Sequence, residues 1–327
     1  MSNYPVSRSC GLSHPTPVRK SMSGCSIVLP VKNGGVLLEK VLASLRNQEG
    51  VQIDSIVGVD SGSEDDSVLI LQRYGARVIQ IPPAEFKHGA TRNLGAEGVT
   101  SDVIVFHNQD AIPVDRFCLK TMMDELAGDE RCAGVCATIM PRSDCDPLMV
   151  RDVLSSSGLM NSWRIKGERD ARILVNPRHF HTISCAIRMD VFRKIPFQDV
   201  AFGEDYLWNH DVQKAGWKTR LSSAVVEHSH PLFPHSISIM RIHADSTYFH
   251  SRFEKQTLSL FIYWLGAGII LDILFIARKR DLGVWHKVGW MLTSPYARGL
   301  EFIGRLAGKY HDYLPGTIRK KLFFYFR

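Results

Sequence analysis

Residues 25–32, Cys-Ser-Ile-Val-Leu-Pro-Val-Lys, decide the fold, because they form an apolar run of strand length that ends in a polar turn. A short run of this composition predicts a buried strand. Apolar residues then recur at helical spacing, at Leu37, Leu38, Val41, Leu42 and Leu45. A second apolar run, 53–59, ends at Asp60 and is followed by turn residues. The order strand, helix, strand predicts the first unit of a parallel sheet.

The same alternation continues along the chain. Further strands are predicted at 77–81, 102–106 and 133–139, and further helices at 89–98 and 115–127. Short connections between alternating strands and helices predict an α/β fold, with a Rossmann-like, mostly parallel sheet and flanking helices. Ligands of such sheets bind beyond the carboxyl ends of the strands. Asp60, Asn108 and Asp110 follow strand ends and are therefore candidate ligand-binding residues.

The composition is that of a globular protein. The chain has 327 residues, 45% of them apolar and 22% charged, which excludes disorder over its whole length. Its seven cysteines are scattered, and several stand inside apolar runs, so buried free thiols are expected and a disulfide scaffold is not. The first strand is not followed by the G-x-G-x-x-G pattern of dinucleotide folds, and the P-loop pattern is absent from the sequence.

Positive charge is concentrated near the C-terminus. Residues 278–327 carry 11 basic and 3 acidic residues, whereas the net charge of the whole chain is +7. Because this segment is also rich in aromatic residues, an anionic membrane surface is favoured over nucleic acid as a partner. The stretch 258–277 contains one charged residue, Asp272, and is long enough to span a bilayer. A span would separate the basic segment from a cytoplasmic domain, so a buried or interfacial helix is favoured.

Six motifs, in order along the chain, resemble those of one enzyme family. They are Pro30-Val31-Lys32-Asn33, the turn 59–65, the segments 86–93 and 108–113, Gly203-Glu204-Asp205 and His228-Ser229-His230. The set is similar to family-two glycosyltransferases of the GT-A fold. The segments 86–93 and 108–113 resemble the bacterial rhamnosyltransferase branch, which acts in the synthesis of O-antigen and other surface polysaccharides. The resemblance extends over about residues 25–320.

The resemblance implies that the chain is divided into three parts. Residues 1–24, which lack the apolar core of a secretory signal, would be a flexible N-terminal arm. Residues 25–254 would form the GT-A catalytic domain, with a nucleotide-binding half at 25–113 and an acceptor half at 114–254. Residues 255–327 would be a basic, apolar helical segment that associates with a membrane.

A divalent cation is the implied cofactor. Transfer from a nucleotide sugar releases a diphosphate, and a cation can stabilise the negative charge that develops on it. Family members place a D-x-D-like motif after the fourth strand for this purpose, and here it reads Asn108-Gln109-Asp110. The resemblance therefore implies Mg²⁺ or Mn²⁺ held by Asp110 together with His228, or with His230. Alternation along an extended segment places both histidines on one side.

The resemblance also implies which residues bind the nucleotide sugar. Asp60 would accept a hydrogen bond from the imide N–H of the base, and Arg92 would reach the diphosphate or base with its guanidinium fork. The other members of this set are Pro30, Val31, Asn33, His88, Gly89, Asn108 and Gln109. Simpler roles stay open, because Asp60 can stabilise a turn, Asp110 can cap a helix and the histidines can be structural.

Asp205 is the predicted general base. Inverting transfer needs a carboxylate that removes the proton of the acceptor hydroxyl as it attacks the anomeric carbon. Glu204 would contact the acceptor or support Asp205, although acids at a helix start can also serve as caps. Trp163 and Trp208 are candidate acceptor-binding residues that could stack on sugar faces, with packing in the core as the alternative.

The sequence thus predicts an inverting glycosyltransferase that is peripheral at the cytoplasmic face of the bacterial inner membrane. The resemblance alone implies dTDP-β-L-rhamnose as donor and a saccharide, lipid-linked in this pathway, as acceptor. A UDP- or GDP-sugar donor is one alternative, and a non-catalytic scaffold subunit of a polysaccharide assembly complex is another. The sequence leaves the oligomeric state open, with a homo-oligomer among the alternatives. A processive synthase is disfavoured, because the sequence lacks a Q-x-x-R-W motif and has a single candidate span.

Overall fold

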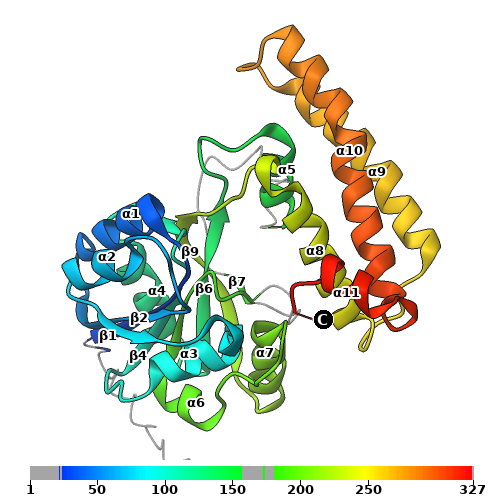
Figure 1. The fold of residues 1–327 in the computed structure, drawn as a ribbon. Coiled ribbons are helices and arrows are strands. Elements are labelled where there is room, and N and C mark those ends of the chain that lie inside the picture. The colour runs from blue at the N-terminus through cyan, green and yellow to red at the C-terminus, as the bar shows by residue number, and fades with distance from the viewer. Residues whose placement is uncertain (1–21, 23, 157–171, 174–179, 326–327) are drawn as a thin grey trace, which may run out of the picture.

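The computed structural model describes residues 22, 24–156, 172–173 and 180–325 (Figure 1). Its strands are β1 (Gly24–Val31), β2 (Gln52–Asp60), β3 (Arg77–Gln80), β4 (Val103–His107), β5 (Ile112–Pro113), β6 (Cys132–Met140), β7 (Arg172–Ile173), β8 (Ser184–Arg188) and β9 (Lys218–Glu227). Its α-helices are α1 (Gly35–Arg46), α2 (Ser67–Arg73), α3 (His88–Ala96), α4 (Cys118–Ala127), α5 (Pro147–Ser156), α6 (Met189–Lys194), α7 (Glu204–Lys214), α8 (Leu232–His250), α9 (Leu258–Arg278), α10 (Val284–Lys309) and α11 (Gly316–Leu322).

A central sheet with helices on both faces forms the larger part of the structure (Figure 1). Its strand order is β3-β2-β1-β4-β8-β6-β9-β5, and β7 also pairs with β9. The strands from β3 to β4 are parallel to one another, whereas β8 is antiparallel to both β4 and β6. The predicted α/β fold with flanking helices is confirmed, and the strands predicted from the first five apolar runs are β1, β2, β3, β4 and β6.

Both faces of the first strand are buried, as its apolar run predicts. Ile27 and Leu29 belong to a core shared with α1, α2 and α4, whereas Val28 points into a second core with α3, α6 and α7. Fully burying each aliphatic side chain is worth about 1.5–3 kcal/mol. The described cysteines are free thiols, and five of them are buried, at Cys25, Cys118, Cys132, Cys136 and Cys185.

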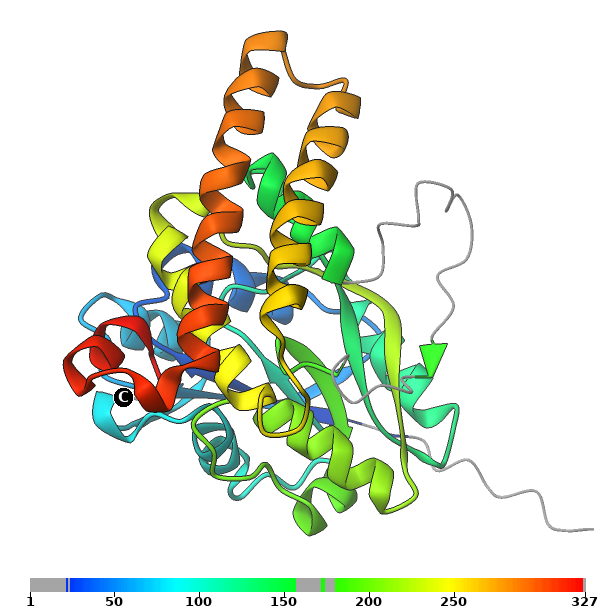
Figure 2. The same cartoon turned by 90° about the vertical axis from the view of Figure 1, so that its right-hand side faces the viewer.

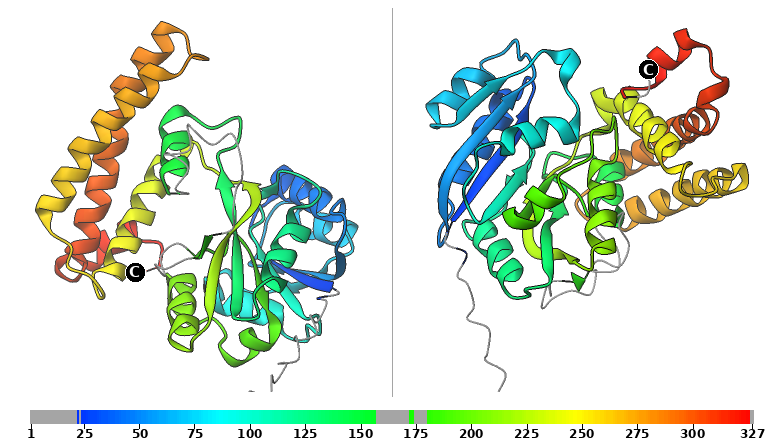
Figure 3. Two further views of the ribbon diagram at one scale, coloured as in Figure 1. Left: turned by 180° about the vertical axis from the view of Figure 1, so that it is seen from behind. Right: turned by 90° about the horizontal axis from the view of Figure 1, so that it is seen from below.

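Three long helices after the sheet form an arm that projects beyond it (Figures 1 and 2). Helices α9 and α10 run antiparallel as a hairpin, and α10 lies along α8 (Figure 3). A Cβ atom on Gly304 or Gly308 of α10 would clash with the backbone of α8, so these glycines permit the close approach of the two helices. The arm is therefore fixed to the sheet domain through α8, which the sequence assigns to the acceptor half.

Within the described residues, α9 is the one helix apolar and long enough to cross a membrane, with a mean hydropathy of 2.2 over its most apolar window. Only 28% of that window is buried. Its charged residue, Asp272, is fully buried and pairs with Arg298 of α10 at 2.8 Å and with Arg151 of α5 at 2.5 Å. One face of α9 is thus packed against the arm and the sheet domain, and the opposite face is exposed.

Candidate active site

A cavity of about 370 Å³ opens at the carboxyl ends of β1 and β4. Nine of the predicted site residues line it, namely Pro30, Val31, His88, Arg92, Asn108, Gln109, Asp110, His228 and His230. Lys32, Phe86, Phe202, Ile242 and Tyr325 complete the lining. Of the three candidate ligand-binding residues at strand ends, Asn108 and Asp110 line the cavity and Asp60 does not.

Asp110, His228 and His230 come together at one wall of the cavity. The carboxylate of Asp110 lies 3.3 Å from Nε2 of His228 and 3.5 Å from Nε2 of His230. One potential ligand atom from each residue lies within 4.8 Å of the others. The three residues lie close together because the pairing of Ile112 with Glu227 joins the turn after β4 to the end of β9. Three convergent donors at this spacing can hold a metal ion.

The two histidines keep Asp110 ionised. Burial pushes the pKa of its carboxyl upward, but the hydrogen bond and charge of His228, with the charge of His230, outweigh burial and bring that pKa to about 2. Burial and His228 lower the pKa of His230. The triad therefore offers one carboxylate and at least one neutral imidazole at neutral pH, which are the forms that bind metals.

His107 holds the turn that carries Asp110. It is fully buried, and burial lowers its pKa to about 4, so it is neutral. Its Nε2 donates to the carbonyl of Ala111 at 2.6 Å, which leaves Nδ1 to accept from the Ser184 hydroxyl at 3.0 Å. Sequence reasoning missed His107, because a histidine at a strand end has no distinctive spacing.

A buried network around Arg92 links α3, β4 and α7. Arg92 pairs with Glu204 at 3.0 Å, and the exposed fractions of the two side chains are 2% and 6%. Arg92 also donates to the side-chain oxygen of Asn108 at 3.0 Å, and Thr182 donates to Glu204 at 3.3 Å. Arg92 lines the cavity, so a rigid positive group stands there, oriented by Glu204.

Asp205 follows Glu204 at the start of α7. The helix begins after Gly203, whose φ of 80° lies in the left-handed region that favours glycine. Removal from bulk water, together with the charge of Glu204, raises the pKa of Asp205 to about 7. A carboxylate of this pKa can take up and release a proton at neutral pH, as a general base must.

Three residues of the predicted nucleotide-sugar-binding set, and also Glu204, Asp205 and Trp208, do not line the cavity. Asp60 is fully buried and accepts from the backbone N–H groups of Gly62 and Ser63 at 3.1 and 3.2 Å. Asn33 accepts from the backbone N–H of Glu64 at 2.8 Å. Gly89 faces the carbonyl of Gln198, where α3 meets the segment before α7. Their contacts with a ligand stay predictions.

Gln109 has a structural role in addition to lining the cavity. Its side-chain amide accepts from the backbone N–H of Lys32 and donates to the carbonyl of Lys32, both at 2.9 Å. The middle residue of the Asn108-Gln109-Asp110 motif thus fastens the end of β1 to the end of β4.

The prediction that Trp208 contacts an acceptor is wrong. Its side chain is fully buried, packs against Phe180 and Phe197, and donates from Nε1 to the carbonyl of Ile195 at 2.9 Å. Helical spacing on α7 places it on the face that covers the sheet. Trp163, the other candidate, lies outside the described residues.

Two of the lining residues that sequence reasoning missed are close to predicted motifs. Lys32 lies inside the first motif, and Phe86 begins the segment 86–93. Phe202, Ile242 and Tyr325 come from other parts of the chain, and only the tertiary structure brings them to the cavity.

Comparison with known proteins identifies the family. The family described as Glycosyl transferase family 2 matches residues 26–196. The chain is 30% identical over 215 residues to the O-antigen chain rhamnosyltransferase RfbN of Salmonella typhimurium, an alignment that covers 64% of this chain and 67% of that protein. It is 29% identical over 218 residues to the O-antigen chain rhamnosyltransferase WbaN of Salmonella anatum, covering 65% and 68% of the two chains.

A solved structure with the same architecture supports the fold. The mannosyltransferase PcManGT from Pyrobaculum calidifontis, in complex with GDP-Man and Mn²⁺, superposes with a TM-score of 0.57 at 14% identity, covering 92% of each chain. At that identity the likeness concerns the fold. With the family match and the two relatives, it shows that the chain belongs to glycosyltransferase family 2, has the GT-A type of α/β fold and is a glycosyltransferase.

Proposed function

We propose that the enzyme transfers L-rhamnose from dTDP-β-L-rhamnose to a saccharide acceptor in the synthesis of O-antigen or a related surface polysaccharide. The similarity to two O-antigen chain rhamnosyltransferases supports the sugar and the pathway. The observation that carries the chemistry is the grouping of the Asp110 triad and Arg92 around one cavity. Asp205 does not line the cavity, but it directly follows Glu204, the buried partner of Arg92. UDP- and GDP-sugars are the competing donors.

The transfer is a single displacement with inversion. The acceptor hydroxyl oxygen forms a bond to the anomeric carbon while the bond between that carbon and the diphosphate oxygen breaks. The proton of the hydroxyl passes to Asp205, and the electron pair of the broken bond leaves with the nucleoside diphosphate. A β-L donor would therefore give an α-L-rhamnoside. The pKa of Asp205, raised to about 7, suits a base that works near neutral pH.

Asp110, His228 and His230 are the residues that would hold the divalent cation. When bound, the cation would supply positive charge that stabilises the departing diphosphate. Mg²⁺ prefers an octahedral set of oxygen ligands, whereas imidazole nitrogen is a better ligand for transition metals. Since the triad offers two imidazoles and one carboxylate, we propose Mn²⁺ as the preferred cation.

Release of nucleoside diphosphate from purified enzyme tests the donor and the cation together. With a mixed saccharide acceptor pool and Mn²⁺, dTDP release from dTDP-β-L-rhamnose should exceed UDP or GDP release from the corresponding sugars at least tenfold. The Asp110→Asn variant should lose the response to Mn²⁺, whereas Asp312→Asn, at an exposed carboxylate outside the cavity, should keep it. Faster release of UDP or GDP would contradict the rhamnose assignment.

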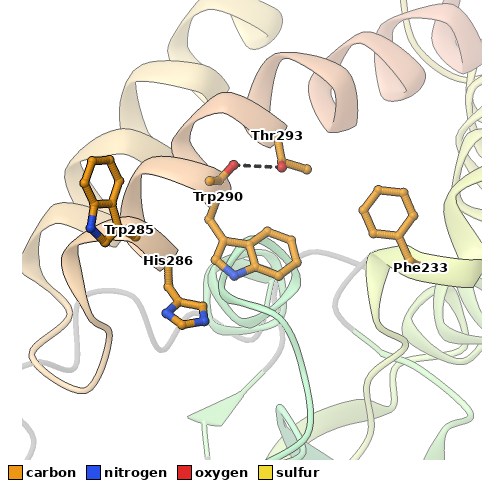
Figure 4. A pocket seen from close by; sticks show the side chains of 6 residues that line it. Phe233, Trp285, His286, Trp290 and Thr293 are labelled. Carbon is orange, nitrogen blue, oxygen red and sulfur yellow. Dashed lines mark hydrogen bonds between the residues drawn. The ribbon is translucent and has the colours of Figure 1, made fainter.

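We propose further that the α9–α10 hairpin lies on an anionic membrane surface. Large apolar side chains are exposed on both helices, including Tyr263 at 67%, Trp285 at 85% and Leu292 at 75%. Trp290 and Phe233 stand on opposite sides of a groove of about 350 Å³ beside this surface (Figure 4). Arg278, Lys279 and Arg280 follow directly at the tip of the hairpin. Apolar area beside clustered positive charge is the pattern of an interfacial helix.

The buried ion pairs of α9 favour an interfacial position over a span. A span would expose Asp272 to hydrocarbon or pull it away from Arg298 and Arg151. Losing one partner of a buried pair costs about 3–5 kcal/mol. Helix α10 also runs back along α8, so both ends of the hairpin stay on one side of the membrane. A lipid-linked acceptor would present its saccharide on that side.

Vesicle flotation tests the membrane surface. The enzyme should float with vesicles of phosphatidylglycerol and phosphatidylcholine and should float less with phosphatidylcholine alone. Trp285→Ser combined with Leu292→Ser should weaken vesicle affinity about a hundredfold or more, because apolar burial contributes about 1.5–3 kcal/mol for each large side chain. Leu69→Ser, at an apolar side chain 59% exposed on α2, is the matched control. Equal flotation of all three proteins would contradict the proposal.

A further inference from the structure

The segment after α11 lies near α8 (Figure 1), and its residue Tyr325 lines the cavity. Phe323 is fully buried and packs beside Ala244. The backbone N–H groups of Phe324 and Tyr325 donate to the buried carboxylate of Asp245, at 2.9 and 3.3 Å. Arg241 donates to the carbonyl of Lys321 at 2.7 Å and covers the Phe324 ring at 5.1 Å. These contacts fix the backbone at Tyr325.

The side chain of Tyr325 forms part of the cavity wall. Its ring lies 5.7 Å from the ring of Phe202 and 5.3 Å from the ring of His88, and all three residues line the cavity. Its hydroxyl oxygen lies 2.6 Å from Nε2 of His88. Residues far apart in the sequence, from α3 and from the segment after α11, thus share a hydrogen bond at the site.

The direction of that hydrogen bond follows from Arg92. A guanidinium can only donate, and Nη1 of Arg92, which also donates to Glu204 and to the carbonyl of His88, lies 3.4 Å from Nδ1 of His88. A proton on Nδ1 would face this donor, so Nδ1 is the nitrogen without a proton. Burial lowers the pKa of His88 to about 4, so the ring is neutral and carries its proton on Nε2. Nε2 therefore donates to the oxygen of Tyr325.

The hydrogen of the Tyr325 hydroxyl is then available for a ligand. Among the described residues, His88 is the one hydrogen-bond partner recorded for this hydroxyl, and it acts as the donor. A partly buried hydroxyl that lacks an acceptor costs free energy unless water or a ligand supplies one. Tyr325 thus presents a directed O–H donor to the cavity, positioned through His88 by Arg92.

We propose that Tyr325 is a further substrate-binding residue, whose hydroxyl donates a hydrogen bond to a hydroxyl oxygen of the transferred sugar. The inference rests on the proposed function, because it requires a nucleotide sugar in this cavity. The sugar is favoured over the base, because Tyr325 packs against Phe202 and its neighbour His88 contacts Arg92, which pairs with Glu204 beside Asp205. A site that donates to a sugar hydroxyl discriminates against sugars that lack it.

Replacement of Tyr325 by phenylalanine tests the role of the hydroxyl. Tyr325→Phe keeps the ring against Phe202 and removes the donor. Calorimetry in the presence of Mn²⁺ should show about tenfold weaker binding of dTDP-β-L-rhamnose, the effect of losing one well-placed hydrogen bond, and unchanged binding of dTDP. Tyr313→Phe, at a tyrosine 85% exposed, is the matched control and should bind both ligands as the original enzyme does.

Other outcomes overturn the inference in distinguishable ways. Equal binding of dTDP-β-L-rhamnose by Tyr325→Phe and the original enzyme would remove Tyr325 from the sugar site. Tighter binding or faster turnover by Tyr325→Ala would mean that the side chain obstructs the cavity. If the folded original enzyme bound no nucleotide sugar at all, the proposed function would fail, and this inference with it.

Nuclear magnetic resonance of ¹⁵N-histidine-labelled enzyme tests the hydrogen bond without a ligand. The His88 signal should be that of a neutral ring protonated on Nε2, and Tyr325→Phe should shift it. A ring protonated on Nδ1 would contradict the donor direction and the inference.

Discussion

Two buried arginines, Arg92 and Arg298, sit in clusters that look alike by charge and differ in function. Arg92 pairs with Glu204 at 3.0 Å, and Arg298 pairs with Asp272 and Asp152, each at 2.8 Å. Their side chains are 2% and 4% exposed. Each cluster joins helices that are distant in the sequence.

The two clusters differ in the volume of open space beside each arginine. Arg92 lines a cavity of about 370 Å³, whereas the space beside Arg298 is about 10 Å³, room for one water molecule. Arg298 is also enclosed by more carboxylates, since Glu301 pairs with it as well. A buried ion pair therefore does not by itself mark a site, and the cavity and the raised pKa of Asp205 make the distinction.

The largest expected effect follows removal of Asp205, the proposed general base. Asp205→Asn should lower kcat by about 10²–10⁴-fold, the contribution of a positioned general base. A raised pKa in the folded state means that stability is lost as pH rises from about 4 to about 7, so the variant should have the higher Tm at pH 8 and no such gain at pH 4. Measuring kcat, and Tm at pH 4 and pH 8, checks the two expectations. Asp199→Asn, at an exposed carboxylate, is the control. Unchanged turnover in Asp205→Asn would exclude Asp205 as the base.

Exchanging each arginine for methionine compares the clusters directly. Arg298→Met should lower the free energy of unfolding by about 3–5 kcal/mol, because Asp272 would be left buried with fewer partners, and should leave kcat per folded molecule unchanged. Arg92→Met should both destabilise the enzyme and abolish nucleotide-sugar binding. Chemical denaturation and calorimetry separate the effects. Loss of substrate binding in a folded Arg298→Met variant would refute the distinction.

The sequence predicts much of the sheet domain and little of the helical arm. A continuous apolar run identified β1, because both of its faces are buried, and helical periodicity identified α1, because one of its faces is buried. The ordered motifs also gathered Arg92, Asn108 and Asp110 correctly at one cavity. Strand ends of a parallel sheet share an edge, so no long-range information was needed.

The features that the sequence did not predict depend on packing between residues far apart in the chain. Trp208 is an aromatic residue near a predicted catalytic pair, and only the position of Phe180 and Phe197 shows that it belongs to the core. The sequence favoured a buried or interfacial helix around Asp272, but it could not identify Arg298 as the partner of that carboxylate. Tyr325 reaches the cavity from the far end of the described chain, which no local pattern indicates.

A smaller effect is expected where a residue acts on the metal triad through the backbone. His107→Phe removes the hydrogen bond of His107 to Ala111, in the turn that carries Asp110, and its hydrogen bond to Ser184. This change should weaken Mn²⁺ affinity about 10–100-fold, the usual cost of losing a group that supports a ligand. His311→Phe, at a buried histidine outside the cavity, is the control. Titration of Mn²⁺ by calorimetry checks the effect, and equal affinity in both variants would mean that His107 serves folding alone.

The smallest expected effect is that of pH. Since Asp205 must be ionised to accept a proton and its pKa is about 7, kcat/KM should fall about tenfold for each unit below pH 7. Arg298 and its partner Glu301 lie outside the cavity, so the folded Arg298→Met enzyme should keep the same pH profile. An acidic limb near pH 4 would indicate that the base has an ordinary carboxyl pKa.

The most direct test of the central claim, that the cavity beside Arg92 is a metal-dependent nucleotide-sugar site, is calorimetric titration with dTDP, UDP and GDP, with and without Mn²⁺. The account predicts Mn²⁺-dependent binding of dTDP that is tighter than that of UDP and GDP and is lost in Asp110→Ala. Absence of binding of all three nucleotides by the folded enzyme with Mn²⁺, or equal dTDP binding by Asp110→Ala, would contradict it.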